Sequence, residues 1–139
     1  MRILIYQALM NNDDLTNECG DRIYQAGSLG VGKTPALPQR PYVLITELPG
    51  TPYPEVRRTS TAILRTFQIW VYDERGDLEL IDKLLGFIHQ SVLGLILQKE
   101  GATGAVCIES RWSGDSQDIV MDQSDLNCKY SLFQLTSTQ

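Results

Sequence analysis

One segment in the second half of the chain constrains the fold more than any other, because its apolar residues repeat with a helical period. These residues are Leu78, Ile81, Leu85, Ile88 and Val92. Their spacing of three and four residues predicts an amphipathic helix over residues 77–97, with Asp77 as its N-cap. A helix with a single apolar face must bury that face against a second layer. The rest of the chain therefore has to supply that layer.

Strands are the predicted second layer. Residues 42–48, 59–72, 105–112 and 126–135 are rich in apolar and β-branched residues, and 21–24 is a shorter candidate. The longest segment alternates, so it has two different faces. One face carries Ile63, Phe67, Ile69 and Val71, and the other carries Leu64, Thr66, Gln68, Trp70 and Tyr72. The second face is mixed rather than fully polar, as expected of a sheet that meets something other than bulk water.

Two short helices are predicted near the N-terminus, over residues 2–10 and 15–19, with the polar run 11–14 between them and Gly20 after them. Helices and strands do not alternate strictly along the chain. This order predicts an α+β fold with an antiparallel or mixed four- to five-stranded sheet and helices packed on one face. The length of 139 residues fits one domain, which we place at residues 1–139.

Composition excludes several classes of protein. Twelve basic and seventeen acidic residues give a net charge of −5, which argues against a protein that grips nucleic acid. The apolar run Ile3–Ile5 is too short for a secretion signal, and no run is long enough to span a membrane, so synthesis in the cytoplasm is expected. Cys19, Cys107 and Cys128 are far apart, and with a single histidine they predict reduced thiols and no metal site.

The segment from Gly27 to Thr34 matches the phosphate-binding loop G-x-x-x-x-G-K-[ST] letter for letter. That loop holds phosphates only where a helix begins at its lysine, because the N–H groups of the helix N-terminus bind the anion. Here Pro35 directly follows Thr34, and two more prolines follow, so no helix can begin at Lys33. We therefore expect a solvated loop and no nucleotide cofactor.

Other candidates for chemistry are weaker. His89 lies one step off the apolar stripe of the predicted helix, with no partner that the sequence can name as a base or nucleophile. Four acidic residues cluster late in the chain, at Asp115, Asp118, Asp122 and Asp125. Their spacing is wrong for a calcium loop, and the central glycine is missing. They predict a solvated acidic loop and no catalytic site.

Candidate contacts with partners come from two places. Tyr53, Arg57 and Arg58 lie in a Pro-containing loop, and arginine and tyrosine are enriched at subunit contacts. Two arginines without a wider basic field are weak evidence for nucleic acid. The mixed face of the longest strand supplies Leu64, Trp70 and Tyr72 as further candidates for an interface.

The order of segments resembles a known family. Gly20-Asp-Arg-Ile-Tyr24 follows the N-terminal helices, Arg40-Pro-Tyr-Val-Leu-Ile45 follows a Pro-rich loop, and Phe67-Gln-Ile-Trp-Val-Tyr72 precedes an acidic turn and one long amphipathic helix. This order is similar to that of the tail terminator, or tail-completion, proteins of long-tailed bacteriophages. The resemblance covers residues 1–97 well and the remainder by layout.

This resemblance implies a non-enzymatic virion protein at the tail and neck of a phage, made in the host cytoplasm. It implies a ring of identical subunits, six in number, that caps the tail tube protein and joins it to the head–tail connector protein. Genome DNA would pass through the lumen without specific binding, which the acidic residues 115–125 would favour by repelling phosphates. No cofactor and no membrane are implied. The alternatives are a head-completion or connector ring protein of the same neck, or a P-loop nucleotide-binding protein.

Overall fold

The computed structural model describes residues 1–25, 41–52, 62–74, 78–101, 104–121 and 126–138. Its centre is a mixed sheet with the strand order β1-β2-β3-β6-β4, and β5 pairs with β6 beside β4. The strands are β1 (Ile23–Gln25), β2 (Tyr42–Pro52), β3 (Ala62–Glu74), β4 (Cys107–Asp115), β5 (Ile119–Met121) and β6 (Leu126–Thr138). Only β1 and β2 pair in parallel; the other pairs are antiparallel.

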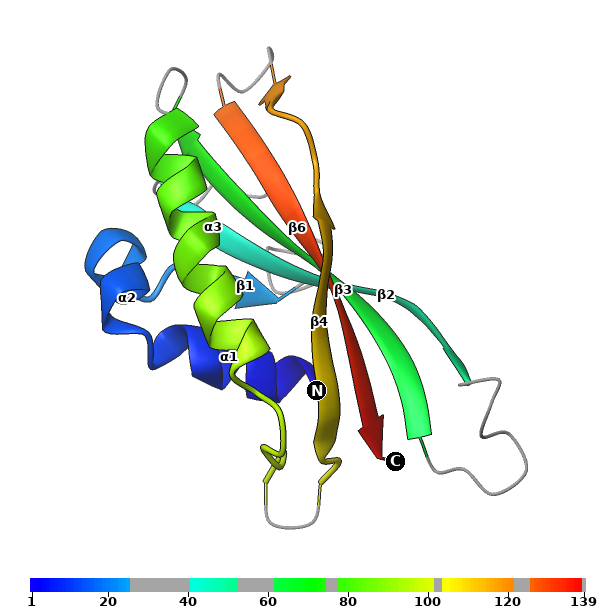
Figure 1. Ribbon diagram of the computed structural model, residues 1–139. Coiled ribbons are helices and arrows are strands. Elements are labelled where there is room, and N and C mark those ends of the chain that lie inside the picture. Colours follow the sequence, from blue (N-terminus) through cyan, green and yellow to red (C-terminus); the bar gives the residue numbers. More distant parts are fainter. Residues whose placement is uncertain (26–40, 53–61, 75–77, 102–103, 122–125, 139) are drawn as a thin grey trace, which may run out of the picture.

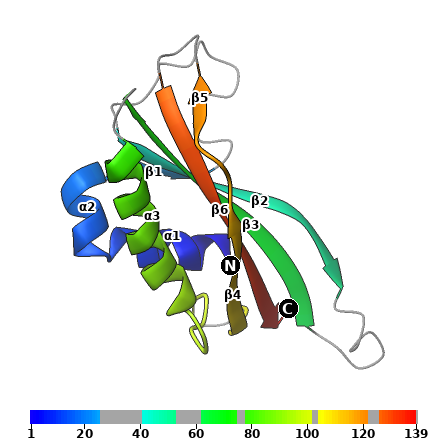
Figure 2. The same cartoon turned by 45° about the horizontal axis from the view of Figure 1, so that its top comes forward.

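Three helices cover one face of this sheet, as the two views of the ribbon show (Figure 1, Figure 2). They are α1 (Arg2–Met10), α2 (Asp13–Cys19) and α3 (Leu78–Leu93). The predicted α+β class and the one-sided helical layer are therefore confirmed. The sheet has six strands rather than four to five, because the apolar segment 119–121, expected inside a loop or hairpin, pairs with β6.

The turn between α1 and α2 follows from local side-chain chemistry. Asn12 is the N-cap of α2, and its side-chain oxygen accepts a hydrogen bond of 3.1 Å from the backbone N–H of Leu15. Gly20 ends the helix with φ 59°, a conformation that side chains with a Cβ disfavour. The short chain that follows delivers β1 alongside β2.

α3 buries the face that its sequence predicts. Ile81, Leu84, Leu85, Ile88 and Val92 are all buried. The helix ends at Leu93, four residues before the predicted end, because Gly94 follows and the chain turns back through Leu97 at φ 69°. The predicted N-cap Asp77 lies outside the described residues. On the exposed side of the helix, Lys83 Nζ lies 3.5 Å from Glu18 Oε1 on α2.

The sheet supplies the other half of the core. Phe67, Ile69 and Val71 are fully buried on the face that meets the helices, as their alternation predicts. They are joined there by Val43 and Ile45 of β2. Strands β2, β4 and β6 end three or more residues after their predicted C-terminal ends. The described part of β3 begins at Ala62, and residues 59–61, which were predicted to belong to this strand, lie outside the described residues.

None of the helices in the described parts of the chain is both long and apolar enough to cross a membrane.

Candidate interaction surface

The side of the sheet that faces away from the helices has an unusual composition. Between Leu64 and Tyr72 of β3, alternation along this strand and along its neighbours β1, β2 and β6 places fifteen residues on that side; Glu74, the last residue of β3, lies past this range. We call them the aromatic face: Tyr24, Tyr42, Leu44, Thr46, Leu48, Leu64, Thr66, Gln68, Trp70, Tyr72, Cys128, Tyr130, Leu132, Gln134 and Thr136. Not one of them is charged, although about a fifth of the chain is charged.

Five aromatic rings run across the centre of this face. Tyr42 stacks on Tyr72 with 4.7 Å between ring centroids, and Tyr24 meets Tyr42 edge-on at 6.1 Å. Trp70 stacks on Tyr72 at 5.9 Å and contacts Tyr130 at 4.6 Å. Such contacts hold the rings in fixed orientations, so this surface is preorganised rather than adaptable.

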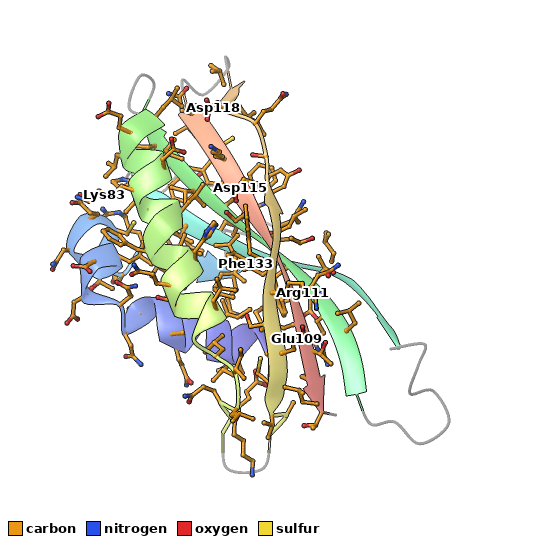
Figure 3. All side chains as sticks on the ribbon, viewed as in Figure 1. Lys83, Glu109, Arg111, Asp115, Asp118 and Phe133 are labelled. Carbon is orange, nitrogen blue, oxygen red and sulfur yellow. The ribbon has the colours of Figure 1, made fainter. Side chains whose placement is uncertain are left out.

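None of the fifteen side chains is fully exposed, because each packs against its neighbours on the adjacent strands. Tyr42 and Cys128 are buried, and the others are half-buried. Burial raises the pKa of the Tyr72 hydroxyl to about 12. Charged side chains on this side of the sheet gather at the edge strand β4, where Arg111 pairs with Glu109 at 2.7 Å (Figure 3). An uncharged centre with a charged rim is the usual anatomy of a protein interface.

The structure gathers some of the predicted interface residues and leaves others untested. Leu64, Trp70 and Tyr72 all lie on the aromatic face. Tyr53, Arg57 and Arg58 lie outside the described residues. The sequence did not single out Tyr24, Tyr42 and Tyr130, because their place beside Trp70 and Tyr72 depends on the strand register. Only the pairing of Tyr42 with Tyr72, and of Trp70 with Tyr130, brings the rings together.

Two of the four predicted acidic loop residues take part in contacts within the chain. Asp115 belongs to β4 rather than to a loop, and its carboxylate accepts hydrogen bonds from Ser131 Oγ and, at 3.1 Å, from Trp112 Nε1. Asp118 lies 3.7 Å from Lys129 Nζ. A hydrogen bond of 3.0 Å to Asp82 is the main cause that raises the pKa of Lys129. Asp122 and Asp125 lie outside the described residues.

His89, Ser131 and Asp115 meet where α3 crosses the sheet, and the three residue types are those of a hydrolase triad. The geometry is different, however. His89 Nε2 lies 2.9 Å from Ser131 Oγ and 3.4 Å from Asp115 Oδ1, so one ring nitrogen faces both partners. In a triad the acid binds the opposite nitrogen. Ser131 is also fully buried, which keeps any substrate away from its hydroxyl.

This group is better explained as a polar clamp between α3 and the sheet. The ring of His89 contacts Trp112 at 5.4 Å and Phe133 at 5.3 Å, so aromatic side chains enclose it on two sides. Ser131 Oγ, which donates to Asp115 in the sheet, also bonds His89 on α3, so this buried hydroxyl links the two layers. The sequence places His89 one step off the apolar stripe of this helix, and its half-buried side chain agrees with that position.

Within the described ranges, no group of three or more His, Cys, Asp or Glu side chains could hold a metal ion. The three cysteines are free and buried, and burial raises the pKa of Cys19 to about 11, which makes it a poor metal ligand or nucleophile. The phosphate-loop motif at 27–34 lies outside the described residues.

Comparison with solved structures gives a relative in fold. A chain from the virion of a native gene transfer agent (GTA) particle superposes with a TM-score of 0.72 at 12% sequence identity. The match covers 100% of this chain and 95% of that chain. No protein-family model and no curated protein sequence matches the chain. At this low identity the likeness establishes a common fold.

Proposed function

We propose that this protein is a non-enzymatic structural subunit of a virion, and that it acts as a tail terminator. In this role identical subunits form a ring, six in number, that caps the tail tube protein and joins it to the head–tail connector protein. Two lines of support are independent of each other. One is the resemblance of the sequence to tail terminators, and the other is the fold shared with a chain from a gene transfer agent virion.

The observation that carries this proposal is the aromatic face. A surface of this size without a single charge is poorly suited to permanent contact with water. Tyrosine and tryptophan are enriched in the centres of interfaces, and charged residues are depleted there. Leu64, Trp70 and Tyr72 would therefore be covered by a neighbouring subunit, as expected of a protein that forms a ring.

The chemistry of the rest of the chain fits a structural role. Among the residues that the structure describes, the cluster around His89 resembles a catalytic site, but its serine is buried and its acid faces the wrong nitrogen of the histidine. The net charge of −5 per subunit would be multiplied around a ring, and DNA could pass through such a ring without binding. Among the described acidic residues of this region, Asp118 has half of its side chain exposed but lies 3.7 Å from Lys129 Nζ, and Asp115 is held within the chain, so the charge of the subunit as a whole carries this argument.

A head-completion or connector ring at the same neck remains the second candidate, because it would need the same kind of subunit contact. The two differ in what fails when the protein is missing. Without a tail terminator, tails should grow to abnormal lengths and fail to join heads. Without a head-completion protein, tails should have normal length, and full heads should lose their DNA.

Electron microscopy of particles assembled without this protein tests the proposal. The expected result is a broad distribution of tail lengths and a population of unjoined heads. A Lys33→Ala variant, which alters the phosphate-loop motif, should restore normal particles as well as the unaltered protein does. Tails of normal length joined to full heads in the absence of the protein would rule the proposal out.

A further inference from the structure

A second apolar surface lies along the seam between α3 and β4. It consists of four exposed side chains, which we call the α3–β4 seam: Leu93, Ile96, Leu97 and Trp112. Leu97 is 78% exposed, the most of any large apolar residue that the structure describes. Its φ of 69° is rare for a residue with a bulky side chain, so the backbone holds Leu97 outward at a cost in free energy.

Hydrogen bonds and ring contacts place these four residues along one side of β4. α3 runs along β4, since Ser110 Oγ donates to the carbonyl of Val92 and the N–H of Leu97 donates to the carbonyl of Cys107. The flank of α3 that faces β4 contains His89, because its ring contacts Trp112. Leu93 follows His89 by four residues and shares this flank. Ile96 and Leu97 lie in the turn after the helix, which the hydrogen bond from Leu97 to Cys107 holds beside the start of β4.

The strand edges are poor places for a second chain to add. β4 has two shifts of register against β6, between Cys107 and Glu109 and between Trp112 and Gly114, which bend the strand. β1 pairs with β2 only at Val43–Ile45. Past that point β2 contains Pro49 and Pro52, which lack the N–H that a new strand would need. Contacts between copies must therefore come from side chains.

We propose that the α3–β4 seam of one copy docks on the aromatic face of a second copy, which makes this pair of surfaces the subunit contact of the proposed ring. The charge pattern supports a second copy as the occupant. A partner that brought a charge to the centre of the aromatic face would bury it without a counter-ion. The seam meets this requirement, because none of its four residues is charged, and the lysine and glutamate beside it, Lys99 and Glu100, lie past its end.

The two surfaces differ and lie on different sides of the subunit, so a contact between them is heterologous. Each bound copy keeps one seam or one aromatic face available for the next copy. Such a contact closes into a ring when the rotation between neighbours divides a full turn. If two aromatic faces bound each other instead, assembly would end at a dimer.

Two single substitutions separate these possibilities. Leu97→Glu puts a charge on the seam, and Gln68→Lys puts one in the middle of the aromatic face. Both positions reach water in the monomer, so the fold should survive, which circular dichroism and a thermal melt would verify. Val120→Glu is the matched control, since Val120 is 49% exposed and belongs to neither surface.

Sedimentation of the purified proteins over a range of concentrations measures assembly. We expect Leu97→Glu alone and Gln68→Lys alone to weaken self-association at least about tenfold, and Val120→Glu to leave it unchanged. A mixture of the two weakened variants should form a dimer and nothing larger, because it contains one intact seam and one intact aromatic face. Normal assembly by Leu97→Glu, or no dimer in the mixture, would overturn the inference.

Where self-association is too weak to sediment, covalent capture gives the same answer. Leu97→Cys and Gln68→Cys proteins, mixed and treated with a short bismaleimide, should give a crosslinked heterodimer, whereas Val120→Cys with Gln68→Cys should not. The native cysteines are buried and should not react. Absence of the heterodimer would refute this contact. This inference rests on the proposed ring. If the crosslink fails while particles without the protein still have abnormal tails, the tail terminator function stands and the subunits contact each other through other surfaces.

Discussion

Ile88 offers a direct test of the core that α3 forms with the sheet. Its side chain is fully buried, and it lies one turn from Leu84, Leu85 and Val92, which are buried as well. Replacing it by alanine removes three carbon atoms. At about 0.8 kcal/mol for each buried carbon, the lost transfer free energy is about 2.4 kcal/mol.

A cavity term adds to this loss, because the neighbours of Ile88 are held by a helix on one side and a sheet on the other and can collapse only in part. We therefore expect Ile88→Ala to lower the free energy of unfolding by about 3–4 kcal/mol, within the range found for such changes. That is a large share of the stability of an ordinary domain.

Chemical denaturation followed by circular dichroism measures this loss. Leu93→Ala on the same helix is the matched control, since Leu93 is 38% exposed, and it should cost below about 1 kcal/mol in the monomer. A loss below about 1 kcal/mol for Ile88→Ala would mean that this stripe does not form the core, and it would refute the packing argument for the two-layer fold.

Two further predictions concern nucleotide binding and the alkaline limit of stability. Calorimetry with ATP and magnesium should show no saturable heat, because the sequence predicts that Pro35 keeps a helix from beginning at Lys33; a micromolar affinity lost in Lys33→Ala would contradict this. Burial raises the pKa of Tyr72 from 10.0 to about 12. The unfolded chain therefore loses the Tyr72 proton at lower pH than the folded protein does, and the free energy of unfolding should fall as the pH rises from 10.0 to about 12. Tyr72→Phe should flatten that fall in denaturant titrations, and an identical slope in both proteins would show that Tyr72 ionises freely.

The sequence predicted those elements whose pattern is local. α3 could be found because its five apolar positions repeat within one segment, and β3 because its alternation is long enough to separate two faces. The end of α3 was misplaced by four residues, because Leu95 and Ile96 continue the apolar pattern after Gly94 has ended the helix. β5 was missed because three residues carry too little pattern to distinguish a strand from a loop.

Features that depend on register could not be read from the sequence. Asp115 was placed in an acidic loop because it stands among polar residues, yet pairing with Ser131 makes it part of β4 and of the clamp around His89. The row of rings from Tyr24 to Tyr130 draws on four strands, and a slip of one residue in any of them would turn its ring to the other face. Two of the five rings, Trp70 and Tyr72, were thus visible in β3 alone, and the other three joined them only with the fold.

The position of β6 has a consequence for how the protein is made. This strand is the last in the sequence, yet it lies between β3 and β4 and pairs with both, and with β5 as well. Until residues 126–138 leave the ribosome, β3 therefore presents a long unpaired edge and β4 has no sheet to join. Folding of the sheet has to wait for the final part of the described chain, and an interrupted chain would expose a strand edge prone to aggregation.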